Sequence, residues 1–116
     1  MAWLMDEPSA GAIDRILPER PTMSWLNLVE VAYRIERTSG RAAADETVAG
    51  LRQQLHVERP GTSRMVEAAR LKARYPMALA DCFAVATAAA TGTTLWTGDP
   101  AIIEAPELPC AVLDLR

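Results

Sequence analysis

Apolar residues recur along this chain with two different spacings, and their alternation predicts an α/β domain. Spacing of three or four residues predicts long helices at 26–38, 41–55, 64–74 and 79–91. A shorter helix is expected at 10–17, where Ser9 is a suitable N-cap. Short apolar runs bounded by turn residues predict strands at 22–24, 56–59, 94–97 and 111–113. Strands that alternate with helices are typical of a parallel sheet covered by helices.

Length and composition favour one globular domain. A chain of 116 residues, half of them apolar, forms a single core. The net charge of -3 argues against coating nucleic acid through bulk charge, yet the basic residues are nearly all arginine, which suits local phosphate contacts. Cys82 and Cys110 form no Cys-x-x-Cys pair, so a zinc site is not expected. Without a signal peptide or an apolar run of membrane-spanning length, we expect a cytoplasmic protein that does not enter membranes.

Three acids stand out because each is surrounded by apolar or small residues. They are Glu30, Asp81 and Asp99. An unpaired carboxylate in such surroundings is costly, and acids near a core without evident basic partners often converge on a cation. The pattern therefore suggests a metal-dependent hydrolytic site.

Each acid also has a purely structural interpretation, which the sequence leaves open. Glu30 shares a helix face with Arg34 and could form a surface ion pair with it or with Arg37. Asp81 could cap the helix that follows it. Asp99 precedes Pro100, and an Asp cap before a proline is a common helix start.

Taken in order, the three acids and their surroundings resemble the PIN-domain ribonucleases, in particular the VapC-type toxins of toxin–antitoxin systems. The matching segments are 24–31 with Glu30, 79–88 with Asp81, and 97–99 with Asp99. The resemblance covers essentially the whole chain. It implies a PIN-like three-layer α/β/α fold with a short parallel sheet.

The N-terminus departs from the family pattern. The family opens with a strand that ends in an aspartate, whereas residues 1–8 resemble the segment after that strand. We therefore expect the first central strand and the first acid to be absent, so that residues 1–116 form a single, N-terminally incomplete domain. Asp6 is not a substitute, because it belongs to a later Asp-Glu-Pro turn. A start codon assigned too far downstream, a truncated chain and a decayed pseudotoxin are three open explanations.

The resemblance implies a Mg²⁺- or Mn²⁺-dependent endoribonuclease that hydrolyses RNA phosphodiesters. Asp81 and Asp99 are expected to bind the metal, and Glu30 to complete its shell or orient a metal-bound water. Asn27 and Thr97 are candidates to support these ligands from behind.

The same resemblance implies partners. Arg34 and Arg37 are candidates for contact with RNA phosphates. A VapB-type antitoxin and a homodimer are also implied. Two alternatives remain at this point: a pseudotoxin that binds an antitoxin without cleaving RNA, and a helical interaction module without strands.

Overall fold

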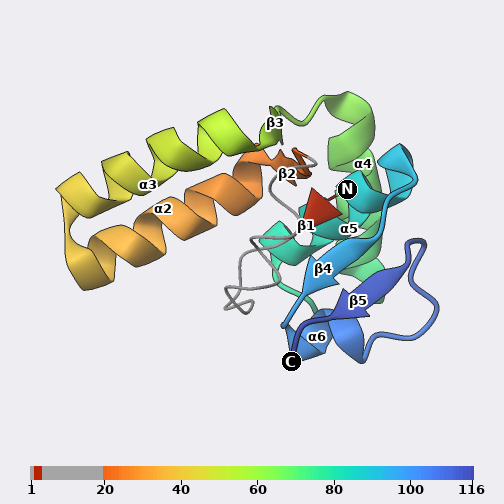
Figure 1. Cartoon of the computed structure of the whole chain (residues 1–116). Coiled ribbons are helices and arrows are strands. Elements are labelled where there is room, and N and C mark those ends of the chain that lie inside the picture. Colours follow the sequence, from red (N-terminus) through yellow and green to blue (C-terminus); the bar gives the residue numbers. More distant parts are fainter. Residues whose placement is uncertain (1, 4–19) are drawn as a thin grey trace.

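The computed structural model describes residues 2–3 and 20–116, and within them the strands form one parallel sheet (Figure 1). The sheet has five strands in the order β3-β2-β1-β4-β5. Their bounds are β1 Ala2–Trp3, β2 Thr22–Ser24, β3 His56–Glu58, β4 Leu95–Thr97 and β5 Val112–Asp114. The four strands predicted from the sequence are all present, and the α/β fold class is confirmed.

The expectation that the central strand is absent is wrong. Ala2–Trp3 occupies the middle of the sheet as β1 and pairs in parallel with both β2 and β4, with Ala2 opposite Thr22 and Leu95. The physical reason is that β2 and β4 each present a row of backbone N–H and C=O groups that require partners. The apolar start of the chain supplies them. Asp6 and the helix expected at 10–17 lie outside the described residues.

Five helices among the described residues connect and cover the strands. Their bounds are α2 Trp25–Ser39, α3 Arg41–Gln54, α4 Thr62–Arg74, α5 Leu79–Thr91 and α6 Pro100–Ile103. The long helices agree with the predicted segments to within a few residues at each end. In Figure 1, α2 and α3 run side by side as a helical hairpin that extends away from the strands, while α4 and α5 lie together behind the sheet.

Two hydrophobic clusters lie on opposite faces of the sheet. One is built around α4 and α5 and contains Leu95 of β4. The other joins β2, α2 and α3, and Trp96 packs against it. Neighbouring residues in a strand point to opposite faces, so Leu95 and Trp96 place one cluster on each side. This arrangement is the three-layer α/β/α architecture that the resemblance implies.

Helix α5 is the most buried helix of the described chain, as its apolar sequence predicts. Residues 81–88 are all buried, including Cys82, which is a small core residue. The helix ends at Gly92, whose φ of 64° is a left-handed conformation that glycine adopts without strain. None of the described helices combines the length and apolar character needed to cross a membrane.

One buried hydroxyl in α5 allows a stability prediction. Thr87 is 0% exposed and its Oγ1 has no hydrogen-bond partner. Thr87→Val removes this unsatisfied group at nearly constant shape, so we expect the free energy of unfolding in urea to rise by about 1 kcal/mol. Thr91→Val is the matched control, because the Thr91 hydroxyl donates to the Thr87 carbonyl at 2.7 Å. An equal loss of stability in both variants would contradict the prediction.

Candidate metal and phosphodiester site

The predicted site residues are distributed around one edge of the sheet. All described strands are parallel, so the carboxyl ends of β2 and β4 lie at the same edge, with β1 between them. The chain leaves β2 into α2 and leaves β4 toward α6. Helix α5 leads into β4, so its N-terminus lies near this edge too. Open parallel sheets bind ligands at such an edge, where successive connections diverge to opposite sides.

Asn27 ties α2 to the start of α5. Its side chain is 1% exposed, and Nδ2 donates a hydrogen bond to the carbonyl oxygen of Ala80 at 2.9 Å. The other amide atom, Oδ1, is buried without a hydrogen-bond partner. A buried acceptor without a partner is uncommon and needs an explanation. The contact with Ala80 places Asn27 beside the residue that precedes Asp81.

Asp81 is buried in the first turn of α5, with 3% of its surface exposed. The interpretation of Asp81 as the N-cap is wrong, because Ala78 holds that position and the helix already begins at Leu79. An acid in the first helical turn interacts favourably with the positive end of the helix dipole. A buried acid at this edge of the sheet suits either a metal ligand or an internal hydrogen-bond acceptor.

Asp99 is both a helix cap and an acid at the end of β4. Its Oδ1 accepts a hydrogen bond from the Ala101 backbone N–H at 2.8 Å, and Pro100 follows as the first helical residue, which confirms the predicted helix start. The buried Thr97 supports this turn, because its Oγ1 accepts from the Asp99 backbone N–H at 3.0 Å. The cap uses one carboxylate oxygen and leaves Oδ2 for another partner.

Glu30 forms the surface ion pair that the sequence allowed. Its Oε1 lies 2.8 Å from Nη2 of Arg34, and the two side chains are 16% and 49% exposed, respectively. Arg37, the other predicted phosphate contact, is exposed near the end of α2. Both arginines lie on the helical hairpin. An ion pair of this kind contributes little to stability, so Glu30 remains free to exchange partners.

The donor chemistry at this edge suits a hard divalent cation, but the described acids do not complete a site. Carboxylate and amide oxygens are the ligands that Mg²⁺ prefers, and Asn27 Oδ1 is an acceptor in need of a partner. Among residues 2–3 and 20–116, however, no three acidic, histidine or cysteine side chains form a group that could hold a metal ion. The joint role of Glu30, Asp81 and Asp99 therefore stays a prediction.

Thiol and imidazole chemistry have little support. Burial raises the pKa of both Cys82 and Cys110, which keeps these free thiols protonated at neutral pH. His56 is exposed at the start of β3 and lines a separate hollow with arginines. The carboxylate and amide oxygens at the carboxyl ends of the strands are therefore better candidates for a catalytic site than the two thiols or the imidazole.

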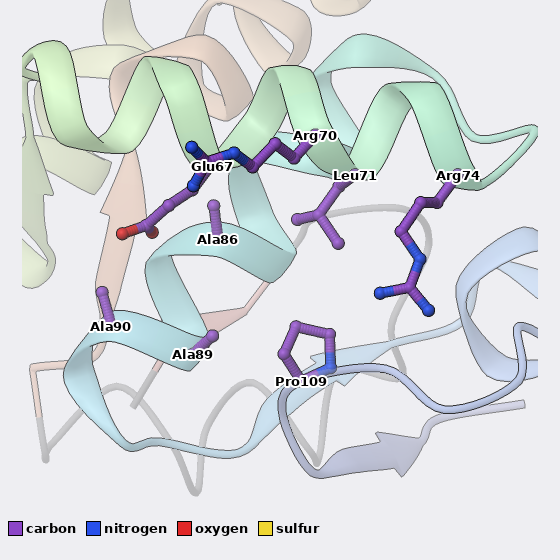
Figure 2. Close-up of a pocket in the computed structure, with 8 residues that line it drawn as sticks. All are labelled: Glu67, Arg70, Leu71, Arg74, Ala86, Ala89, Ala90 and Pro109. Atoms are coloured by element: carbon purple, nitrogen blue, oxygen red, sulfur yellow. The ribbon is translucent and has the colours of Figure 1, made fainter.

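A second hollow lies on the far side of α5, between α4 and the loop before β5. Figure 2 shows its alanine floor on α5, with Leu71 and Pro109 at the sides and Glu67, Arg70 and Arg74 around the rim. Its volume is about 300 Å³. Because only one acid lines it, this hollow is a poor candidate for phosphodiester chemistry.

Sequence reasoning missed the arginine-lined hollow that includes His56, which has a volume of about 380 Å³ and lies beside the start of α2 and the edge strand β3. The hollow is lined by Arg20, Trp25, Arg52, His56 and Arg59, together with Leu55 and Val57. Its arginines come from three separate segments, and no local spacing connects them. The arginine-rich composition was the single signal that such a patch could exist.

The fold and the edge described above define an α/β protein with acids at the carboxyl ends of its parallel strands. The PIN domain profile matches residues 1–108, and the chain belongs to this family. A search of curated proteins finds no match.

Solved structures of VapBC complexes and VapC toxins share the fold. VapBC2 from Rickettsia felis, bound to a promoter DNA fragment, superposes with a TM-score of 0.70 at 12% identity over 90% of this chain and 82% of that one. DNA-bound VapBC from Salmonella typhimurium superposes with a TM-score of 0.71 at 17% identity, over 91% of this chain and 83% of that one. VapC20 from Mycobacterium tuberculosis is a toxin that cleaves the sarcin–ricin loop. It superposes with a TM-score of 0.64 at 20% identity, over 81% of this chain and 80% of that one.

Proposed function

We propose that this chain is a divalent-metal-dependent endoribonuclease, the toxin component of a type II toxin–antitoxin system. One observation carries the proposal. Within a PIN domain, the buried Asp81 lies next to Asn27, whose Oδ1 is buried without a partner, at the sheet edge where β2 and β4 end. Burying the Oδ1 acceptor of Asn27 costs free energy unless a partner, such as a bound ligand, compensates for it.

In this proposal each predicted site residue has a separate role in metal binding or catalysis. Asp81 and Asp99 would hold Mg²⁺ or Mn²⁺. Asn27 and Thr97 would support the two acids through the hydrogen bonds to the Ala80 carbonyl and from the Asp99 backbone N–H described above. Glu30 leaves Arg34 and orients the attacking water. The bound ion would neutralise charge on the phosphodiester and lower the pKa of the water.

The proposed function is tested by RNA cleavage and metal binding in parallel. Cleavage of structured RNA, such as transfer or ribosomal RNA, should require Mg²⁺ or Mn²⁺ and stop on addition of EDTA. Mn²⁺ binding, followed by electron paramagnetic resonance without RNA, should weaken in Asp99→Asn. Asp45→Asn is the matched control, since Asp45 is an exposed acid on α3. Cleavage that persists in EDTA would refute the metal-dependent mechanism.

The proposed partners follow from the fold that this chain shares with VapBC complexes. We propose a VapB-type antitoxin that blocks cleavage, and a homodimer of the toxin. Co-expression with a cognate VapB-type antitoxin should yield a stable complex without ribonuclease activity. Light scattering on the isolated toxin reports its oligomeric state.

A pseudotoxin that binds the antitoxin but cleaves no RNA is the second candidate. It is favoured by the lack, among the described residues, of a group of three metal-binding side chains. In that case Mn²⁺ binding would be absent while antitoxin capture persists. Stoichiometric Mn²⁺ binding together with RNA turnover would exclude it.

A further inference from the structure

The hollow beside β3 concentrates positive charge on a protein whose net charge is -3. Arg20, Arg52 and Arg59 line it, and all three are exposed. Across the described chain, none of the three makes an ion pair with an acid. Arg64, by contrast, is held by Glu58 at 2.7 Å and Glu67 at 3.4 Å. Unpaired arginines gathered around one hollow favour an anionic ligand.

Trp25 holds two of these arginines in place. The guanidinium carbons of Arg52 and Arg59 lie 5.2 and 5.6 Å from its ring centroid. Contacts within about 6 Å are cation–π interactions. A cation–π contact attracts the guanidinium charge without pairing it with an acid. The planar N–H fork of each arginine can therefore still bind phosphate oxygens in a bidentate manner. The ring also limits the side-chain freedom that would be lost on binding.

The hollow is a neighbour of the candidate cleavage site. Trp25 and Asn27 both belong to the first turn of α2. Residues two apart on a helix point to opposite sides, so Trp25 faces α3 and β3 while Asn27 faces α5. The two sites are separated by roughly one helix diameter, about 10 Å. An extended polynucleotide crossing the start of α2 spans such a distance within a few nucleotides.

Resting on the proposed function, we propose that Arg20, Arg52 and Arg59, organised by Trp25, bind the phosphodiester backbone of RNA next to the site of cleavage. The arginines contact phosphates rather than base edges, so this subsite contributes affinity and register without reading the sequence. Arg52 and Arg59 are the main contacts, because Trp25 holds both.

The test measures RNA binding without cleavage. Fluorescence anisotropy of a labelled oligouridine in EDTA compares the wild type with the double variant Arg52→Gln/Arg59→Gln. We expect about tenfold weaker binding and a salt dependence, log Kd against log salt, that is shallower by about 1.4, since each phosphate contact on single-stranded RNA contributes about 0.7. Arg52→Lys/Arg59→Lys keeps both positive charges but loses the planar guanidinium forks. Its affinity for RNA should lie between that of the wild type and that of the glutamine double variant.

Arg70→Gln/Arg74→Gln is the matched control, because it removes the same charge from the rim of the hollow in Figure 2. Thermal unfolding checks that each variant is folded. Equal loss of RNA affinity in both double variants would overturn the proposal. So would loss of antitoxin binding with RNA affinity unchanged, which would assign the hollow to an acidic protein segment. Because EDTA prevents metal-dependent cleavage, these outcomes are independent of whether the chain is an active nuclease.

Discussion

Asp81→Asn is expected to lower the rate of RNA cleavage by roughly 100-fold or more while leaving the protein folded. A loss of that size corresponds to about 3 kcal/mol of transition-state stabilisation, in the range that a catalytic cation provides. Asparagine has nearly the same shape as aspartate, so the first turn of α5 keeps its packing. It lacks the negative charge that the proposed divalent ion would require.

The measurement is single-turnover cleavage of a labelled RNA at saturating Mg²⁺ or Mn²⁺, with Asp45→Asn as the control for loss of an exposed acid. Circular dichroism and a melting curve verify the fold, because Asp81 is buried. If Asp81→Asn and Asp45→Asn both cleave like the wild type, Asp81 is a structural residue and the metal assignment fails. If cleavage falls but Mn²⁺ affinity is unchanged, Asp81 acts on RNA and does not hold the ion.

Asn27→Ala is expected to reduce both cleavage and stability. The substitution removes the 2.9 Å hydrogen bond to Ala80 and leaves a small cavity between α2 and α5. Together these changes should lower the free energy of unfolding by about 2 kcal/mol. Residues that orient metal ligands typically contribute roughly 10- to 100-fold to activity, so a similar fall in cleavage is expected.

A second substitution separates the two effects of Asn27. Asn27→Leu fills the space and removes the unpaired Oδ1, so its stability should be close to that of the wild type. Its cleavage rate should stay as low as that of Asn27→Ala, because the amide is still missing. Gln54→Ala, which deletes an exposed amide on α3, is the control. Recovery of cleavage in Asn27→Leu would show that Asn27 serves packing alone.

Element positions could be predicted from the sequence because their signals are local. The apolar spacing of 79–91 and the following Gly92 placed α5, and the Asp99-Pro100 pair placed the start of α6. The predicted start at residue 79 is confirmed, and the alternative interpretation of Asp81 as the helix cap is therefore wrong, since Leu79 and Ala80 are good helix formers that precede it within the helix. Local helix propensity and capping preferences therefore set the starts of both α5 and α6.

The central strand could not be predicted in the same way. Two residues, Ala2 and Trp3, are too short a segment to show a period. They form a strand because β2 and β4 on either side require hydrogen-bond partners. The backbone groups of β2 and β4 need these partners only after the two strands have taken their places in the sheet.

The sequence by itself determined the α/β class, the order of the elements from β2 onward and the positions of Glu30, Asp81 and Asp99 along the chain. The tertiary structure decided that Asn27 contacts Ala80, 53 residues away, and that Arg52 and Arg59 meet at Trp25. Periodicity and capping act between residues a few positions apart. Contacts between distant segments depend on how the helices pack on the sheet, and no local pattern records that packing.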